Sequence, residues 1–293
     1  MSMVRANGLS VHVEQLAPAE AVAGWHGAAP TAVLIHGLTT DTLASWYLTL
    51  AQPLAAGGLR VIMYDLRGHG HTERPPEGYA LDDFVDDLTA LLVALDVTGP
   101  IHLFGNSFGG TIAFGYAVRH PERVTAIAAI ESSPPTAAWF ERVAQQLHHA
   151  AAYLPREHAL AEIRAERGEL ASRRARTARE VLAATSLVRD LPASRLPAEE
   201  GIAAIGCPVL WVYGGDSPVV GLVPEARRLL PRARFVTVPG QRHSLLVDQP
   251  GAVRDIVLSW LREDCGLPPG QPDIGGLSGH DGQDQPSAPA TAH

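Results

Sequence analysis

Residues 100–120 read PIHLFGNSFGGTIAFGYAVRH and contain the most informative pattern in the chain. The first part of this stretch, IHLF, is a short apolar run of the kind found in strands that are buried on both faces. Its last part, from Gly109 onward, predicts a helix. Between them, GNSFG places Ser107 in a strand–turn–helix context, which is the setting of a nucleophile elbow. Glycines at 105 and 109 fit this setting because larger side chains there would collide with the adjoining strand and helix. The alternative is that Ser107 lies in an ordinary glycine-rich turn without a catalytic role.

Apolar runs like IHLF recur along the chain, and helix-like stretches separate them. This alternation predicts a mostly parallel, doubly wound α/β sheet with right-handed crossovers. Residues 10–15, SVHVEQ, alternate in polarity and predict an antiparallel edge strand. The other predicted strands lie at 32–35, 60–64, 124–130, 208–213 and 234–238, and the predicted helices at 43–57, 81–95, 109–119, 222–230 and 250–262.

The pattern of strands stops between about Pro134 and Pro197. Alanine, arginine, glutamate and leucine dominate this part of the chain, a composition that favours helices. We therefore expect residues 135–197 to form a helical cap inserted into an α/β core built from 1–134 and 198–262. Residues 263–293 have almost no large apolar side chain, and we expect them to be a disordered tail.

Composition limits the possible function classes. The chain has 293 residues, of which 46% are hydrophobic and 18% charged, and a net charge of −8. We expect a soluble protein that binds neither nucleic acid nor a membrane, because nucleic acid and anionic membranes select basic surfaces. No basic leader precedes an apolar stretch and there are only two cysteines, Cys207 and Cys265, so a cytoplasmic location is expected. The expected partner is a small, largely uncharged substrate, and the oligomeric state is left open.

A serine hydroxyl needs a base to become a nucleophile, and His243 is the candidate. It lies in PGQRHSLL, directly after the last predicted strand, and it follows Ser107 in the chain order that an elbow enzyme requires. Most of the thirteen histidines are expected to be surface or packing residues. His148 and His149 point apart on a helix and make a poor metal pair. We expect no metal, and without a glycine-rich nucleotide loop we expect no cofactor.

A second signal is His36-Gly37-Leu38, at the end of the first buried strand. Acyl transfer needs donors for the negative charge that develops on a carbonyl oxygen, and backbone N–H groups serve without reorganising. The expected oxyanion donors are the amides of Leu38 and Phe108, with His36 near the substrate. Alone, His36-Gly37 reads equally well as a turn that ends a strand.

Five motifs in this order resemble the α/β-hydrolase superfamily. They are HG at 36–37, YDLRGHGHTERP at 64–75, GNSFGG at 105–110, RHPERV at 119–124 and PGQRHS at 239–244. The resemblance covers residues 4–262 and leaves the cap only loosely matched. It implies the fold and the serine mechanism but no substrate, because the same fold hosts many activities.

The resemblance also exposes a departure at the acid of the catalytic triad. The family usually places this carboxylate at the fourth position of a G-x-x-D turn, but the turn here reads Gly214-Gly215-Asp216-Ser217. A second location known in the family is the end of the strand after the elbow, where Glu131 stands. A carboxylate at the end of an apolar strand is costly unless it is paired. We therefore predict Glu131 as the acid, with Asp216 as the alternative.

The leading hypothesis is a serine hydrolase that cleaves an ester, lactone or thioester of a small, largely apolar substrate through an acyl-enzyme on Ser107. Trp139 and Phe140, just inside the cap, are expected to line the substrate pocket. An acyltransferase or cyclising enzyme could use the same triad. An alternative outside the enzymes is a receptor that binds a small molecule without catalysing a reaction. The sequence does not distinguish hydrolysis from acyl transfer or cyclisation, and it does not identify the substrate.

Overall fold

A computed structural model of the chain describes residues 2–19 and 29–267. In this part of the chain, eight strands form one sheet in the order β1-β2-β4-β3-β5-β6-β7-β8. The strands are β1 (Ser2–Ala6), β2 (Leu9–Leu16), β3 (Thr31–Ile35), β4 (Arg60–Tyr64), β5 (Ile101–Asn106), β6 (Val124–Ile130), β7 (Val209–Gly214) and β8 (Arg234–Val238). From β4 to β8 all neighbours are parallel, while β1 and β2 pair antiparallel at one edge. The predicted fold class is confirmed.

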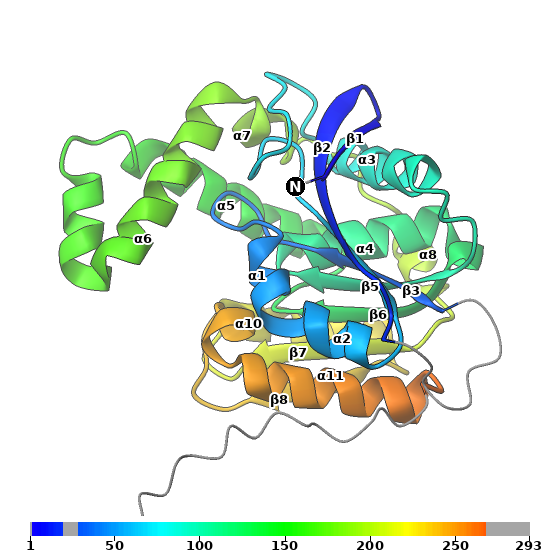
Figure 1. Cartoon of the computed structure of the whole chain (residues 1–293). Coiled ribbons are helices and arrows are strands. Elements are labelled where there is room, and N and C mark those ends of the chain that lie inside the picture. Colours follow the sequence, from blue (N-terminus) through cyan, green and yellow to red (C-terminus); the bar gives the residue numbers. More distant parts are fainter. Residues whose placement is uncertain (1, 20–28, 268–293) are drawn as a thin grey trace, which may run out of the picture.

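Helices cover both faces of this sheet (Figure 1). Those of the core are α1 (Ala44–Trp46), the π-helix η1 (Tyr47–Ala51), α2 (Gln52–Ala56), α3 (Leu81–Ala94), α4 (Phe108–Arg119), the 3₁₀ turns η2 (Pro121–Arg123) and η3 (Pro218–Leu222), α8 (Glu199–Ala203), α9 (Val223–Leu229), α10 (Leu245–Asp248) and α11 (Pro250–Asp264).

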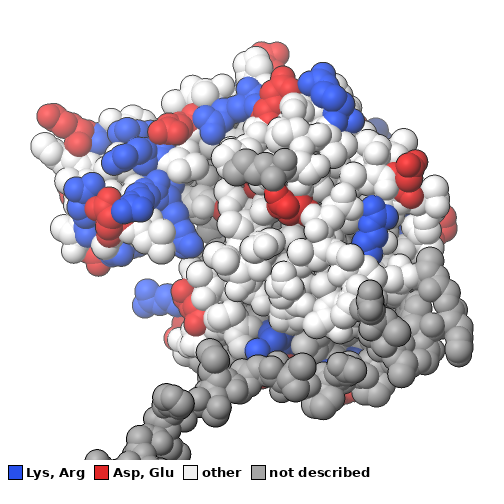
Figure 2. Space-filling view, viewed as in Figure 1, with Lys and Arg blue, Asp and Glu red and all other residues white. Residues whose placement is uncertain are grey.

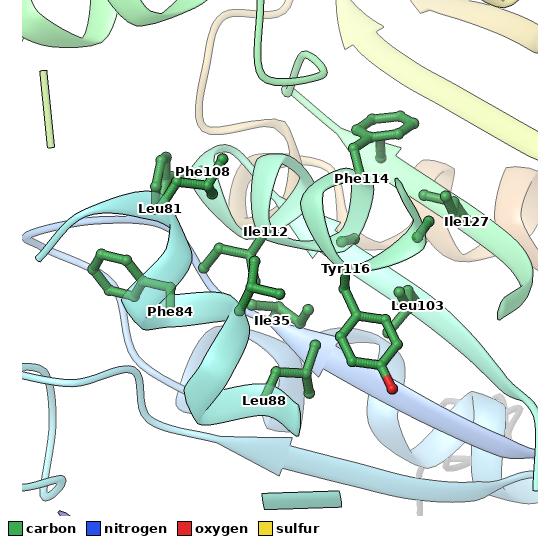
Figure 3. Packing of buried hydrophobic residues seen from close by; sticks show 14 of the residues in the cluster. Ile35, Leu81, Phe84, Leu88, Leu103, Phe108, Ile112, Phe114, Tyr116 and Ile127 are labelled. Carbon is green, nitrogen blue, oxygen red and sulfur yellow. The ribbon is translucent and has the colours of Figure 1, made fainter. Parts of the chain in front are cut away.

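The strands send alternate side chains into two separate cores because successive residues of a strand point to opposite faces. In β3, Val33 and Ile35 join the core under α3 and α4, whereas Ala32 and Leu34 join the core under α2 and α11. Figure 3 shows the first core, where Ile112 of α4 lies beside Ile35. Phe84 of α3 packs edge-on against Phe108, with ring centroids 5.4 Å apart. This packing fixes the amino end of α4, and with it the residue that precedes the helix, Ser107.

Between β6 and α8 the chain runs through three helices: α5 (Ala137–Tyr153), α6 (Ala159–Ala184) and α7 (Leu187–Asp190). Gly168 interrupts α6 with a φ of 83°, so this element consists of two helices joined at a kink. The α6 segment projects away from the sheet (Figure 1), and Figure 2 shows arginine side chains gathered over it. All basic side chains in Figure 2 are arginines, because the sequence contains no lysine.

The carboxyl-terminal boundary of the core lies beyond the predicted one. Helix α11 includes Glu263 and Asp264, and Leu267 is buried. The rest of the predicted tail, 268–293, lies outside the described residues. Among the helices that the structure describes, none combines the length and the apolar character needed to cross a bilayer.

Candidate active site

Ser107 sits in the sharp turn between β5 and α4, with φ 51° and ψ −122°. Its backbone N–H donates to the oxygen of Ile130 (2.8 Å), and its own carbonyl accepts from Gly110 (3.0 Å). A Cβ on Gly105 would lie 2.2 Å from Gly110, and one on Gly109 would lie 2.0 Å from the oxygen of Ile35. The two glycines of the motif are therefore required by close backbone approach, and the strained serine conformation is held from both sides.

His243 reaches Ser107 from the loop after β8. The Ser107 Oγ to His243 Nε2 distance is 3.0 Å, and the His243 side chain is 38% exposed. The loop crosses the end of β7 at Gly214, where a Cβ would lie 2.1 Å from the oxygen of Gln241. The amide of Asp216 also donates to Gln241 (3.0 Å). Glycine at 214 thus allows the loop to approach closely enough to bring the imidazole to Ser107.

Glu131 is fully buried, and its carboxylate meets three donors. Its Oε1 accepts from the amide of Gly214 (2.5 Å), while its Oε2 accepts from the hydroxyl of Ser217 and lies 3.1 Å from His243 Nδ1. Three hydrogen bonds compensate the cost of burying a carboxylate. Because an ionised carboxylate only accepts, Nδ1 carries the proton, and Nε2 is free to accept from Ser107.

The structure separates the two candidate acids. Asp216 is exposed, and its backbone rather than its side chain bonds the loop that carries His243. Ser217, which stands where the family usually has its carboxylate, is 5% exposed and donates to Glu131. The residues that follow β6 and β7 therefore meet at the triad acid. Glu131, directly after β6, supplies the carboxylate, and Ser217, in the turn after β7, supplies a hydroxyl. The sequence analysis did not single out Ser217, although the missing carboxylate at 217 was a signal.

In the loop after β3, the Leu38 amide has no hydrogen-bond partner among the described residues, whereas several neighbouring amides are bonded. Gly37 donates to Asp41 (2.9 Å), Thr39 to His69 Nε2 (2.7 Å) and Thr40 to the oxygen of Leu38 (2.7 Å). Within residues 2–19 and 29–267, no group accepts from the Leu38 amide. Phe108 is the first residue of α4, and first-turn N–H groups have no partner within a helix. In the part of the chain that the structure describes, the two predicted oxyanion donors are thus amides to which no backbone oxygen is bonded.

His36 does not line a substrate pocket, contrary to expectation. Its side chain is fully buried and both ring nitrogens have partners: Nδ1 lies 2.7 Å from the oxygen of Gly37, and Nε2 accepts from Leu66 (2.9 Å). Accepting at Nε2 leaves the proton on Nδ1, which therefore donates to Gly37. In a trans peptide the C=O and the following N–H point in opposite directions. By holding the Gly37 carbonyl, His36 therefore fixes the direction of the Leu38 N–H.

His69 is a second support for this loop. Its Nδ1 donates to the oxygen of Arg67 (2.8 Å), which leaves Nε2 to accept from Thr39. Burial, helped by the neighbouring His36, lowers the pKa of His69 to about 4. The imidazole is therefore neutral near pH 7, as an acceptor must be.

The two aromatic residues of the predicted pocket differ in their surroundings. Trp139 is 2% exposed, and its Nε1 donates to Thr111 of α4 (2.7 Å), so it anchors α5 to the core. Phe140 packs edge-on against Phe108, with ring centroids 6.4 Å apart. Phe140 therefore lies next to the residue that follows Ser107. Throughout the described ranges, no group of three or more histidine, cysteine or acidic side chains is placed to hold a metal ion.

Comparison with known proteins gives a family match. A family model described as "alpha/beta hydrolase fold" matches residues 30–195. A 2-hydroxymuconate semialdehyde hydrolase from Pseudomonas sp. (strain CF600) is 41% identical over 99 residues, 33% of this chain but only 35% of that protein. A 2-(acetamidomethylene)succinate hydrolase from Mesorhizobium japonicum is 27% identical over 239 residues, covering 74% of this chain and 82% of the relative.

Solved structures are similar over most of the chain. One, from work on carboxylesterases of Nitrososphaera gargenis, has a TM-score of 0.68 at 25% sequence identity. It covers 90% of this chain and 99% of its own. The similarity thus extends past the 30–195 match and includes the part of the chain that carries His243.

Proposed function

Since the chain belongs to the α/β-hydrolase fold family, we propose that it is a serine hydrolase that cleaves carboxylic ester-type bonds. The observation that carries the proposal is the continuous contact from Ser107 through His243 to Glu131, at 3.0 Å and 3.1 Å. A nucleophile, a base and a buried carboxylate in this order are what acyl transfer through a serine requires. Relatives that are themselves named hydrolases support the same class.

In the first half of the reaction, Ser107 Oγ attacks the carbonyl carbon of the substrate while its proton passes to His243 Nε2. The carbonyl oxygen becomes an anion and takes hydrogen bonds from the amides of Leu38 and Phe108. Glu131 stabilises the imidazolium through Nδ1. As the intermediate collapses, the bond to the leaving group breaks, and His243 returns the proton to the departing oxygen. An acyl-enzyme on Ser107 remains.

In the second half, water replaces the leaving group. His243 Nε2 takes a proton from the water as its oxygen attacks the acyl carbon. The same two amides hold the second oxyanion. Collapse breaks the bond between the acyl carbon and Ser107 Oγ, the serine recovers its proton, and the acid leaves. The cycle needs no group beyond the triad, the two amides and water.

The proposed substrate is a small ester, lactone or thioester with an apolar acyl portion. Phe108 and Phe140 support this, because their apolar rings pack edge-on against each other next to the nucleophile. Helices α5 to α7 follow directly from the strand that carries Glu131 and are proposed to act as the cap over the substrate. In this proposal, residues at the ends of the strands carry out the reaction at the carbonyl group, and the cap helices determine which acyl groups the site accepts.

A series of p-nitrophenyl esters from acetate to decanoate tests the proposal. Wild-type protein should hydrolyse the short members with a rate that depends on chain length. Ser107→Ala and His243→Ala should each lower kcat by roughly 10³-fold or more. An Asp255→Asn variant is the matched control, since Asp255 lies on α11 and, among the described residues, bonds only Arg254. Equal turnover by wild type and Ser107→Ala would rule out the mechanism.

A further inference from the structure

Asp41 joins the two halves of the site, although nothing in the sequence marked it. Its Oδ2 accepts from the amide of Gly37 (2.9 Å), in the loop after β3, and from the Asn106 side chain (3.0 Å), in the elbow. Its Oδ1 accepts from the amide of Thr42 (2.9 Å). One carboxylate therefore ties the loop of Leu38 to the residue directly before Ser107.

The space between loop and elbow is tight enough for this tie to matter. A Cβ on Gly37 would lie 3.3 Å from the Cβ of Ser107 and 3.4 Å from Asp41 Oδ2. The loop backbone thus lies against the nucleophile, with no side chain between them. A small displacement of Gly37 would also displace the peptide unit between Gly37 and Leu38, which contains the Leu38 N–H.

We propose that Asp41 is a positioning residue of the oxyanion hole: it holds the Leu38 amide at the correct distance from Ser107 by anchoring Gly37 to Asn106. The inference rests on the proposed serine mechanism, because the Leu38 amide has this role only in acyl transfer. Asp41 does not touch the reacting atoms. It completes the set of contacts made by His36 on the carbonyl of Gly37 and by His69 on Thr39.

A carboxylate is the only side chain that serves all three donors here. An asparagine in its place has one acceptor oxygen and one NH₂ group. If the oxygen faces Gly37 and Asn106, the NH₂ group faces the N–H of Thr42. If the amide is turned, the NH₂ group faces the other two donors. Asp41→Asn must therefore leave at least one donor unpaired, while its size stays the same.

The test compares Asp41→Asn and Asp41→Ala with the control Asp255→Asn. Loss of a whole oxyanion donor costs about 10²–10³-fold in kcat, and a displaced donor costs part of that. We expect kcat per titrated site to fall roughly ten-fold in Asp41→Asn and up to about 100-fold in Asp41→Ala, with KM changed less than about three-fold. Titration of active sites with a fluorophosphonate removes any effect of misfolded protein. The affinity for phenylboronic acid, whose tetrahedral adduct places an oxygen in the same hole, should fall in parallel.

A second readout does not depend on turnover. Amide hydrogen exchange over residues 36–41 should be faster in both Asp41 variants than in wild type, and unchanged in Asp255→Asn. If wild type neither hydrolyses esters nor reacts with the fluorophosphonate, the proposed function fails, while exchange still decides whether Asp41 anchors the loop. If exchange and kcat per site both match wild type, Asp41 is not a positioning residue. Faster exchange with unchanged kcat and boronate affinity would likewise overturn the proposal.

Discussion

Glu131 adopts a left-handed backbone conformation, φ 52°, that bulky residues rarely occupy. Its amide donates to Val212 of β7 (2.8 Å) and its side chain turns back to the Gly214 amide, so the surrounding strands hold it there. Sequence reasoning could propose Glu131 because a carboxylate at the end of an apolar strand needs a partner. It could not find Asp41, because its role depends on a contact between loops distant in the chain, and for Ser217 the missing carboxylate at that position was the one signal. It misplaced His36 because proximity to the site in sequence does not show which way an imidazole faces.

Substitution of the two candidate acids tests the assignment residue by residue. Glu131→Gln keeps size and burial but removes the charge that stabilises the imidazolium, so kcat should fall by about 10³–10⁴-fold. Asp216→Asn should change kcat less than about two-fold, because its side chain is exposed. Hydrolysis of p-nitrophenyl butyrate measures both. If only Asp216→Asn abolished turnover, the triad acid would be Asp216, in the turn after β7, and not Glu131.

At the level of elements, the strands of the parallel sheet were predictable within about two residues, since burial on both faces gives continuous apolar runs. Strand β1 was missed: its residues are largely exposed and carry no such run. The signal that could have found it is Asn7-Gly8, whose positive φ values of 46° and 76° form the tight turn between β1 and β2. The helix expected at 43–57 contains the π-helix η1, which apolar periodicity does not reveal.

The paired ends of β6 and β7 predict that the acid can be moved between strands. Ser217→Asp in a Glu131→Ala background places a carboxylate in the turn after β7, near the position that Glu131 Oε2 now occupies. We expect it to restore kcat at least about ten-fold over Glu131→Ala alone. Ser217→Asp with Glu131 retained should be harmful, because two adjacent buried carboxylates cannot both ionise. Initial rates of p-nitrophenyl ester hydrolysis compare the three variants. No recovery in the double variant would mean that the two strand ends are not interchangeable.

Across the whole molecule, some buried ionisable groups belong to the proposed active site, and others, such as His102, lie far from it and affect only stability. The triad and its loop lie at the carboxyl ends of the parallel strands, whereas His102 is buried near the start of β5, at the opposite end of these strands. Burial lowers the pKa of His102 to about 4 from an ordinary value of 6.5. The folded protein thus keeps this histidine neutral at a pH where the unfolded chain would protonate it. Its contribution to stability is separate from the chemistry at Ser107.

This separation predicts a pH dependence of stability. Because the pKa of His102 is lower in the folded state, the unfolded chain binds more protons, and folding stability falls as the pH drops from 6.5 toward 4. Each such histidine contributes up to about 1.4 kcal/mol per pH unit in this window. Urea unfolding at pH 7.5, 6.0 and 5.0 should therefore give a shallower loss of stability for His102→Gln than for wild type. Identical slopes would show that His102 is protonated as readily in the folded protein.

Ser107 is the proposed nucleophile, and His243 is proposed to activate it. The most direct measurement is the mass and position of the adduct formed with a fluorophosphonate, followed over time in wild type, His243→Ala and Ser107→Ala. We predict one adduct per chain in wild type, located on the peptide that contains Ser107. We also predict a rate at least about 10²-fold lower in His243→Ala and no adduct in Ser107→Ala. Unmodified wild-type protein, or an adduct on a different serine, would contradict the account.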